Sequence, residues 1–284
     1  MLEIISSILD GLLIGLIYGL ASIGLTLIFG VMDVVNLAHG SIIALGMFSL
    51  LLFFGAGLNP YLALLPVLVL GFLFGVIIYL IAVRRIINGP SLMTLLATFA
   101  VSMIIVGVGT AIWSTSPYNV NIKSSTLNIL GYTVTSARLI AALAAVLVTF
   151  ALYYFLYKTT LGKAVRAVSN NREAAELMGI PSQQILAISF GIGTALAMLS
   201  GALIATMFPF TILSGGIYEL KSFVASVLGG LGNPTGALFG GIILGLIEGS
   251  VAPFIQVSWT NVIEFVLFVL ILLFFPRGLL GGRR

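Results

Sequence analysis

Long hydrophobic runs separated by short polar stretches make up most of this 284-residue chain. Uninterrupted runs occupy residues 8–31, 40–55, 61–83, 91–113, 139–157, 185–207 and 262–275. A further apolar region, 223–251, is broken by the sequence Gly-Gly-Leu-Gly-Asn-Pro. Most runs approach or exceed the ~18 apolar residues that mark a membrane-spanning helix, and none alternates with the period of two typical of a membrane β-barrel strand. The pattern therefore predicts eight or nine helical segments, one of them broken or a half-helix.

The composition supports a lipid environment for these helices. Hydrophobic residues make up 60% of the chain and charged residues only 7%, with a mean hydropathy of +1.25, whereas a soluble domain carries about 25% charged residues. Because lipid offers no hydrogen bonds, the backbone groups must bond within each helix. We therefore expect an all-α integral membrane protein, a polytopic helical bundle that forms a single transmembrane domain over residues 1–284.

The basic residues are distributed unevenly between the two sides that alternating helices would define. One side carries most of them: Arg84, Arg85, Lys158, Lys163, Arg166, Arg172, Arg277, Arg283 and Arg284. The other side carries Lys123 and Arg138, and Lys221 is ambiguous because it adjoins the broken region. Basic residues accumulate on the cytoplasmic side of membrane proteins. The expected topology is a multi-pass protein of the inner or plasma membrane, with its N-terminus outside and its C-terminus in the cytoplasm.

Glycines recur at four-residue spacing in several of the runs. The clearest series are Gly11, Gly15, Gly19; Gly71, Gly75; and Gly241, Gly245, Gly249. Helices in lipid associate through the close backbone approach that small residues permit. We expect these stripes to pack helices of this chain against one another, with a face for a second subunit as the alternative.

One long polar interruption, residues 158–181, lies on the side predicted to be cytoplasmic. Within it Asn170 is a candidate N-cap, with Glu173 as its partner in a capping box. Gly179 suits the position after the helix, and Pro181 prevents its continuation. The sequence predicts a helix of about eight residues that docks in a groove of a cytosolic partner. The alternative is a capped connector that lies at the membrane surface.

Four motifs resemble those of one transporter family. The sequence Glu173-Ala174-Ala175 followed by Gly179 resembles the EAA–G loop of ABC importer permeases, without the usual downstream Ile-x-Leu-Pro. Its wider context resembles the branched-chain amino acid permease family, as do three further motifs: Asn36-Leu37-Ala38-His39-Gly40, the stretch Val227 to Ala237, and Phe275-Pro276-Arg277-Gly278-Leu279. These matches occur in order and extend over nearly the whole chain, whose length is similar to that of the smaller permease subunit.

The resemblance implies a function and a set of partners. The chain would be the permease subunit of an ABC importer for branched-chain amino acids, paired with a second homologous permease, two cytosolic ATP-binding subunits and an external substrate-binding protein. Segment 158–181 would then be the coupling loop that meets an ATPase. The residues expected to carry that coupling are Asn170, Arg172, Glu173, Ala174, Ala175, Leu177 and Gly179.

Two polar sites could line the path of a solute. Asp33, Asn36 and His39 would share one face if helical, either in the pathway or at the cytoplasmic interface, where polarity costs little. The second site is the helix break, with Gly229, Gly230, Gly232 and Asn233 as its candidate lining residues. Broken helices place free carbonyls along the pathway of many transporters. The alternative is a tight turn between two ordinary helices.

Motifs for chemistry are missing from the sequence. It has no GxxxxGK[ST] phosphate loop, no cysteine and a single histidine, so no catalytic, metal or cofactor site is predicted and the chain is not expected to be an enzyme. Two other functions stay open: a permease for a different small solute, such as urea, an amide or a sugar, and a self-sufficient secondary carrier or channel.

Overall fold

A computed structural model describes residues 2–122, 125–129, 132–254, 257–275 and 278–279. Over these residues the chain is mostly helical. The α-helices are α1 (Leu2–Met32), α2 (His39–Gly55), α3 (Leu64–Ile78), α4 (Ser91–Trp113), α5 (Ser136–Lys158), α6 (Thr160–Asn170), α7 (Arg172–Leu177), α8 (Ser182–Ala205), α9 (Gly215–Gly229), α10 (Pro234–Val251) and α11 (Val257–Phe274). A π-helix, Tyr79–Val83, extends α3, and a 3₁₀ turn, Ile212–Ser214, precedes α9. The strands β1 (Thr126–Ile129) and β2 (Tyr132–Thr135) form an antiparallel hairpin.

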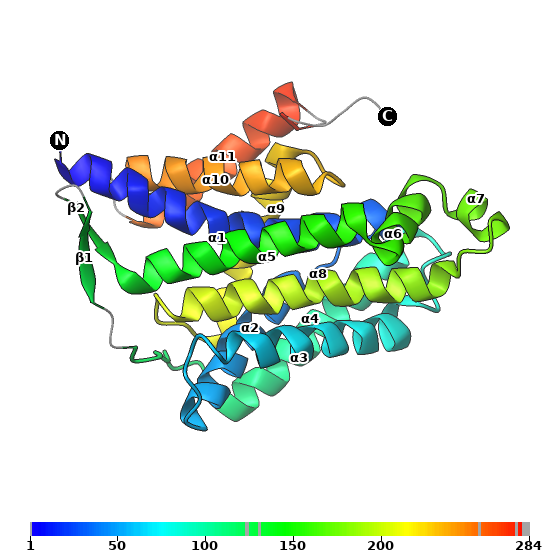
Figure 1. Cartoon of the computed structure of the whole chain (residues 1–284), viewed down its shortest axis with the longest axis horizontal. Helices are drawn as coiled ribbons and strands as arrows, with labels where there is room; N and C mark the ends of the chain where they lie inside the picture. The colour runs from blue at the N-terminus through cyan, green and yellow to red at the C-terminus, as the bar shows by residue number, and fades with distance from the viewer. Residues whose placement is uncertain (1, 123–124, 130–131, 255–256, 276–277, 280–284) are drawn as a thin grey trace.

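The expected all-α membrane bundle is confirmed. Six helices of the described chain are long and apolar enough to cross a membrane, and α2 and the segment 262–274 are shorter apolar helices. Helices α1, α5, α8 and α10 follow the long axis of the molecule (Figure 1). The N-terminus and the β-hairpin lie at one end of this axis, and α6 and α7 project from the other.

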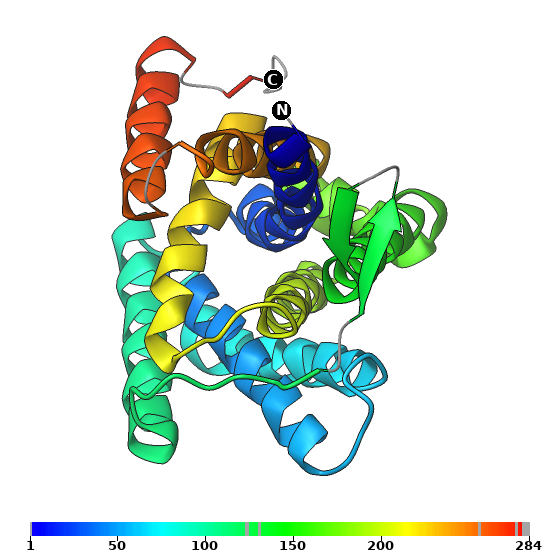
Figure 2. The same cartoon turned by 90° about the vertical axis from the view of Figure 1, so that its left-hand side faces the viewer.

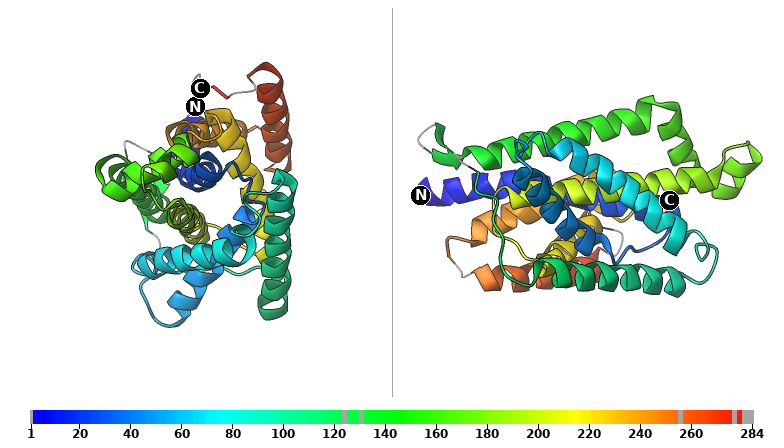
Figure 3. Two further views of the ribbon diagram at one scale, coloured as in Figure 1. Left: turned by 90° about the vertical axis from the view of Figure 1, so that its right-hand side faces the viewer. Right: turned by 90° about the horizontal axis from the view of Figure 1, so that it is seen from below.

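Helices α1 and α8 form the centre of the bundle. Most of each is buried inside the chain, whereas a third or less of the spans at α3, α4 and α5 is buried. The exposed faces of these outer helices are apolar, as lipid contact requires. Helix α9 differs from its neighbours because it runs across the bundle in the view down the long axis (Figure 2). Helices α4 and α11 lie along the same side of the molecule (Figure 3).

The glycine stripes pack helices of this chain against one another, as expected. A Cβ atom built on Gly11 would lie 2.8 Å from the Cα of Gly249, and one on Gly15 would lie 2.9 Å from the carbonyl oxygen of Gly241. The second stripe joins α3 to α8, where a Cβ on Gly71 would lie 2.8 Å from the Cα of Ala195. At these points the two backbones touch directly.

Apart from the buried Lys221, the described basic residues separate between the two ends of the bundle. The end that carries α6 and α7 also carries the residues Arg84, Arg85, Lys158, Lys163, Arg166 and Arg172. Arg138, in the first turn of α5, lies at the opposite end and pairs with Asp10. Of the basic residues that the charge bias counted, Lys123, Arg277, Arg283 and Arg284 lie outside the described residues, as does Pro276 of the C-terminal motif.

The glycine contact between α1 and α10 leads to a stability prediction. Replacing Gly245 by Ala would place a methyl group into the backbone of Gly11 and Gly15, so the two helices must separate. Overpacking of this kind costs about 1–3 kcal/mol, and we expect a lower melting temperature in detergent. Gly107→Ala in α4 is the matched control, because no atom lies within 4 Å of the position that its new methyl group would take. Equal melting temperatures for the two variants would contradict the prediction.

Candidate functional site

Two helices, α6 and α7, project together from one end of the bundle (Figure 1). The predicted cap of the projecting helix is wrong by one position. Asn170 ends α6, and it is Asn171 whose side chain accepts a hydrogen bond from the N–H of Ala174, at 2.9 Å. Glu173 therefore stands at the second helical position, too early for a capping box, and α7 has six residues. Gly179 has the expected left-handed conformation, with φ of 81°.

The tip of α7 exposes apolar side chains. Leu177 is 89% exposed and Met178 is 83% exposed. Glu173 and Ala174 are exposed beside them, whereas Ala175 is buried. Exposed apolar groups beyond the end of a membrane bundle are unfavourable in water, so this tip has the character of a docking surface. Of the residues predicted to carry coupling, Ala175 supports α7 from within instead of facing outward.

Polar bonds fix α7 to the loops beside it. Arg172 donates to Glu176 at 3.2 Å and to Asn88 at 3.0 Å, and Ser182 donates to Glu176. The hydrogen bond from Ser182, followed by the bond and charge of Arg172, lowers the pKa of Glu176. Arg172 thus holds α7 in place through contacts with its own chain.

The base of α6 contacts the end of α1, which in turn contacts the turn between α9 and α10. Ser169 donates to the carbonyl oxygen of Gly30 at 2.5 Å. A Cβ on Gly30 would lie 3.0 Å from the Cα of Gly232 in that turn. The predicted helix break is therefore a tight turn at this end of the bundle, in which Gly230 and Gly232 take left-handed φ values of 96° and 84°.

The four candidate residues of the break lie together in this turn. Gly229 ends α9, Gly230 and Gly232 form the turn, and Asn233 caps α10 by accepting from the N–H of Gly236 at 3.2 Å. The backbones of Gly229 and Gly236 touch. The structure does not bring this group together with Asn36 and His39.

A second polar site lies deep in the bundle, where α2 begins. Asp33 is exposed at the end of α1 with φ of 53°, and the following segment to Ala38 is not helical. Asn36 is 1% exposed and His39 is fully buried. The His39 ring bonds the carbonyl oxygen of Ala21 at 3.0 Å. Ala21 lies about 16 Å before the end of α1 at ~1.5 Å per residue. Asn36 and His39 thus lie inside the bundle, while Asp33 stays at its end.

The hydrogen bonds of Asn36 and His39 determine which of their polar atoms are left for a ligand. The Asn36 side-chain oxygen accepts from the N–H of Ala38 at 3.1 Å, which leaves its NH₂ group as a buried donor without a partner among the described residues. A carbonyl oxygen only accepts, so the His39 Nε2 carries the hydrogen. The buried His39 Nδ1 is then an acceptor, also without a partner in the described part of the chain.

A carboxylate from α9 completes the site. The N–H of Gly40, in the first turn of α2, donates to the side chain of Glu219. A Cβ on Gly40 would lie 2.5 Å from the Glu219 Cβ, so the glycine permits this contact. Helix α2 has no side-chain cap of its own, and the Glu219 carboxyl takes that place at its N-terminus. In the sequence Glu219 is only a charge that flanks the broken region, because the contact depends on how α2 and α9 meet.

A buried ion network joins the last three helices. Lys221 in α9 pairs with Glu248 in α10 at 2.9 Å and with Glu264 in α11 at 2.7 Å. Lys221 is 5% exposed and Glu264 is 1% exposed. The hydroxyl of Tyr18 donates to Glu248, and its ring lies 4.9 Å from the Lys221 Nζ. From the sequence alone, these charges could pair with one another or with a second subunit, and the structure pairs them within the chain.

Among the described residues, no group of three or more His, Cys, Asp or Glu side chains could hold a metal ion. Around the start of α2, Asn36 offers a buried donor and His39 a buried acceptor, each without a partner among the described residues, and the Glu219 carboxyl lies beside Gly40. The tip of α7 offers the exposed apolar side chains of Leu177 and Met178.

Comparison with known proteins identifies relatives along nearly the whole chain. Residues 7–272 match the family described as branched-chain amino acid transport system / permease component. The chain is 30% identical to the high-affinity branched-chain amino acid transport system permease protein BraD of Pseudomonas aeruginosa, over 98% of this chain and 95% of that protein. It is 27% identical to the permease LivH of Escherichia coli K12, over 99% and 96%.

A solved structure shares the fold. PsaBC from Streptococcus pneumoniae, determined in complex with a Fab, aligns over 96% of this chain and 92% of that chain, with a TM-score of 0.50 and 14% sequence identity. At that identity the likeness concerns the arrangement of helices alone.

The polar contacts of α7 predict a pH-dependent local stability. A lowered pKa means that the ionised Glu176 favours the folded α7 at neutral pH, and that this contribution is lost as the pH falls through the lowered pKa. We expect Glu176→Gln to speed hydrogen exchange across residues 172–178 at neutral pH, with wild type and variant converging in acid. Glu173→Gln is the matched control because Glu173 is equally exposed but forms no ion pair with the described residues, and it should exchange like wild type. If the two variants exchange alike at neutral pH, the network does not hold α7.

Proposed function

Because this chain belongs to the family of branched-chain amino acid transport system permease components, we propose that it forms the membrane path of an ABC importer for branched-chain amino acids. The observation that carries the proposal is the match over residues 7–272, together with relatives that cover almost the entire chain. Since the sequence has no phosphate loop, ATP would be hydrolysed on separate cytosolic subunits. A second permease subunit and an external binding protein would complete the assembly.

The proposed orientation places α6 and α7 in the cytoplasm. The N-terminus is then outside and the C-terminus inside, and the chain acts as one permease domain over residues 1–284. The excess of arginine and lysine at the α6–α7 end supports this orientation. Segment 158–181 is the coupling loop of this domain, and the exposed Leu177 and Met178 form its contact with an ATPase.

The start of α2 is the proposed site where an amino acid pauses on its way through the bundle. A zwitterion needs donors for its carboxylate and acceptors for its ammonium group. The Asn36 NH₂ and the N-terminal turn of α2 provide donors, and His39 Nδ1 and Glu219 provide acceptors. In the present state Glu219 occupies the Gly40 N–H. The substrate carboxylate would take over that donor and free Glu219 for the ammonium group.

One side-chain hydrogen bond and one backbone contact connect the coupling loop to this site. Ser169 in α6 bonds Gly30, Gly30 touches Gly232, and α9 leads from that turn to Glu219. A ligand or partner can shift such an arrangement only by binding its two states with different affinity. The closing ATPases would bind α7 more tightly in one of the two states. At the other end, the amino acid would bind the site at Glu219 more tightly in one of them.

The coupling surface can be tested with a double substitution. We expect Ala174→Asp with Leu177→Asp to reduce ATP hydrolysis stimulated by the loaded binding protein at least about tenfold, because a loss of about 1.4 kcal/mol corresponds to that factor. The assay uses the reconstituted complex in vesicles. Leu58→Asp is the control, since Leu58 is 42% exposed in the loop between α2 and α3 at the opposite end. Stimulated hydrolysis at the wild-type rate in the double variant would rule out docking through α7.

The proposed amino acid site predicts that uptake depends on Glu219, the acceptor of the substrate's ammonium group. We expect Glu219→Gln to lower leucine uptake at least about tenfold, because hydrogen bonds to charged groups contribute about 1.5–3 kcal/mol. Glu219→Asp retains the charge and should recover part of the uptake. ATPase binding to both variants is measured in parallel, so that loss of assembly is distinguished from loss of the site. Full leucine uptake by Glu219→Gln would remove Glu219 from the path and leave the importer assignment intact.

A further inference from the structure

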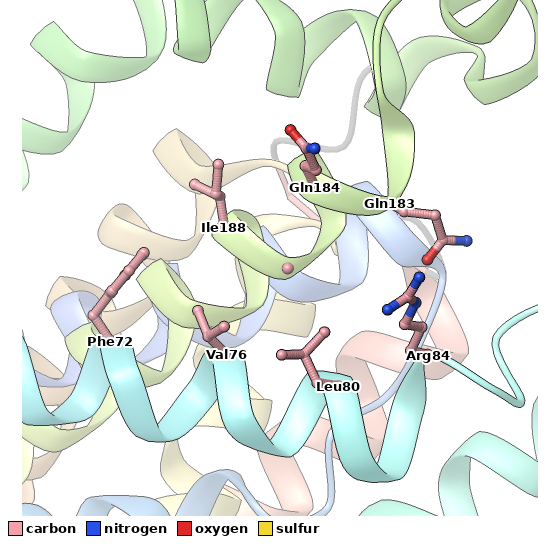
Figure 4. Close-up of a pocket in the computed structure, with 8 residues that line it drawn as sticks. Phe72, Val76, Leu80, Arg84, Gln183, Gln184 and Ile188 are labelled. Carbon is pink, nitrogen blue, oxygen red and sulfur yellow. The ribbon is translucent and has the colours of Figure 1, made fainter.

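An elongated cavity of about 480 Å³ lies between α3 and α8, away from the start of α2. Its lining residues are Phe72, Val76, Leu80, Arg84, Gln183, Gln184, Ala187 and Ile188. Figure 4 shows Phe72, Val76 and Leu80 in sequence along α3 and its π-helical extension, with Ile188 facing them from α8. The Arg84 guanidinium and the Gln183 amide lie at the opposite end of the cavity from Phe72. The cavity is therefore apolar along its length and polar at one end.

The apolar part of the cavity lies at the depth of the hydrocarbon. Both walls belong to helices that are long and apolar enough to span a membrane, 64–83 and 182–205. Phe72, Val76 and Leu80 follow one another at a spacing of four, so they share one face of this span. Water does not fill an apolar groove at this depth, and the natural occupant is an acyl chain of the surrounding lipid.

The polar end lies at the level of the lipid headgroups. Arg84 directly follows the span and the π-helix Tyr79–Val83, whose wider turn ends in the bond from the Arg84 N–H to the Tyr79 carbonyl oxygen at 2.7 Å. Single π turns of this kind frequently occur at functional sites. The Tyr79 hydroxyl donates to the Gln183 side-chain oxygen at 2.8 Å, which leaves the Gln183 NH₂ as a donor.

The charge of Arg84 is available to a ligand. No acidic side chain of the described residues forms an ion pair with it, and Arg84 is exposed. A guanidinium binds a phosphate through two parallel hydrogen bonds, and basic pockets between membrane helices on the cytoplasmic side bind anionic headgroups.

We propose that this cavity binds an anionic phospholipid. One acyl chain lies along Phe72, Val76 and Leu80, and the phosphate accepts hydrogen bonds from Arg84 and from the Gln183 amide. Free phosphate would use only the polar end, whereas the length of the apolar wall favours the lipid. The bound lipid would also stand beside the base of α7, because Ser182 precedes Gln183 and bonds Glu176.

The test is lipid retention by the purified full chain. The protein is extracted in detergent, offered phosphatidylglycerol or phosphatidylcholine, and the bound lipid is quantified by native mass spectrometry. We expect the wild type to retain phosphatidylglycerol preferentially, and Arg84→Ala to retain it at least about tenfold less, because alanine offers neither a charge nor a hydrogen bond to the phosphate. Arg85→Ala removes the same charge from the adjacent residue, which does not line the cavity, and should retain lipid like wild type.

A second variant tests the apolar wall independently of charge. Ala187→Trp fills the cavity from α8 and should lower phosphatidylglycerol retention without changing the melting temperature of the lipid-free protein. If Arg84→Ala and Arg85→Ala lost phosphatidylglycerol equally, its retention would depend on general surface charge, and the proposal would be overturned. Full retention by Ala187→Trp, or displacement of the lipid by inorganic phosphate alone, would overturn it as well. Unchanged lipid retention in Arg84→Ala with loss of ATPase binding would assign the cavity to a protein partner instead.

Discussion

The direct contact between the backbones of α1 and α10 is the constraint on which the rest of the structure depends. In lipid, two helices gain little by hiding apolar side chains from each other, so their attraction rests on close packing. Gly11 and Gly15 meet Gly241, Gly245 and Gly249 without intervening side chains. This contact fixes α1 at the centre of the bundle. Helix α1 in turn provides the carbonyl oxygen of Ala21 to His39 and that of Gly30 to Ser169. Helix α1 therefore positions both the start of α2 and the base of α6.

The helices could be predicted from the sequence because lipid imposes a simple rule on it. A helix that crosses a membrane needs a long apolar run, and the run 91–113 has the same bounds as α4. The glycine stripes also indicated correctly that helices of this chain pack together. The predicted cap of α7 was wrong by one residue because Asn170 and Asn171 are chemically equal, and only the path of the backbone decides which one accepts the bond.

The deep polar site could not be predicted in the same way. Asn36 and His39 are close to the end of a predicted helix, which suggested the interface as one of two locations. The chain instead folds back into the bundle after Asp33, and that reversal depends on the bonds from His39 to Ala21 and from Leu37 to Thr98. Glu219 is remote in sequence and joins only because α9 crosses the bundle. Contacts of this kind depend on tertiary packing, which leaves no periodic signal in the sequence. The hairpin of β1 and β2 was likewise not predicted.

The ion network of Lys221 gives α9 a fixed attachment. Two carboxylates surround one ammonium group and a tyrosine hydroxyl bonds one of them, so removing either charge partner would leave a buried charge without full compensation. Lys221 stands between Glu219 and the turn at Gly230, near the middle of α9. Helix α9 crosses the bundle and is attached at Lys221, so it would pivot at this point. A push from α6 would pass through the bond of Ser169 to Gly30 and from Gly30 to Gly232, and would then emerge at Gly215 as a sideways displacement against Gly40. The contacts at the two ends of α9 join backbone to backbone, so little of the movement would be absorbed there by side-chain rotation.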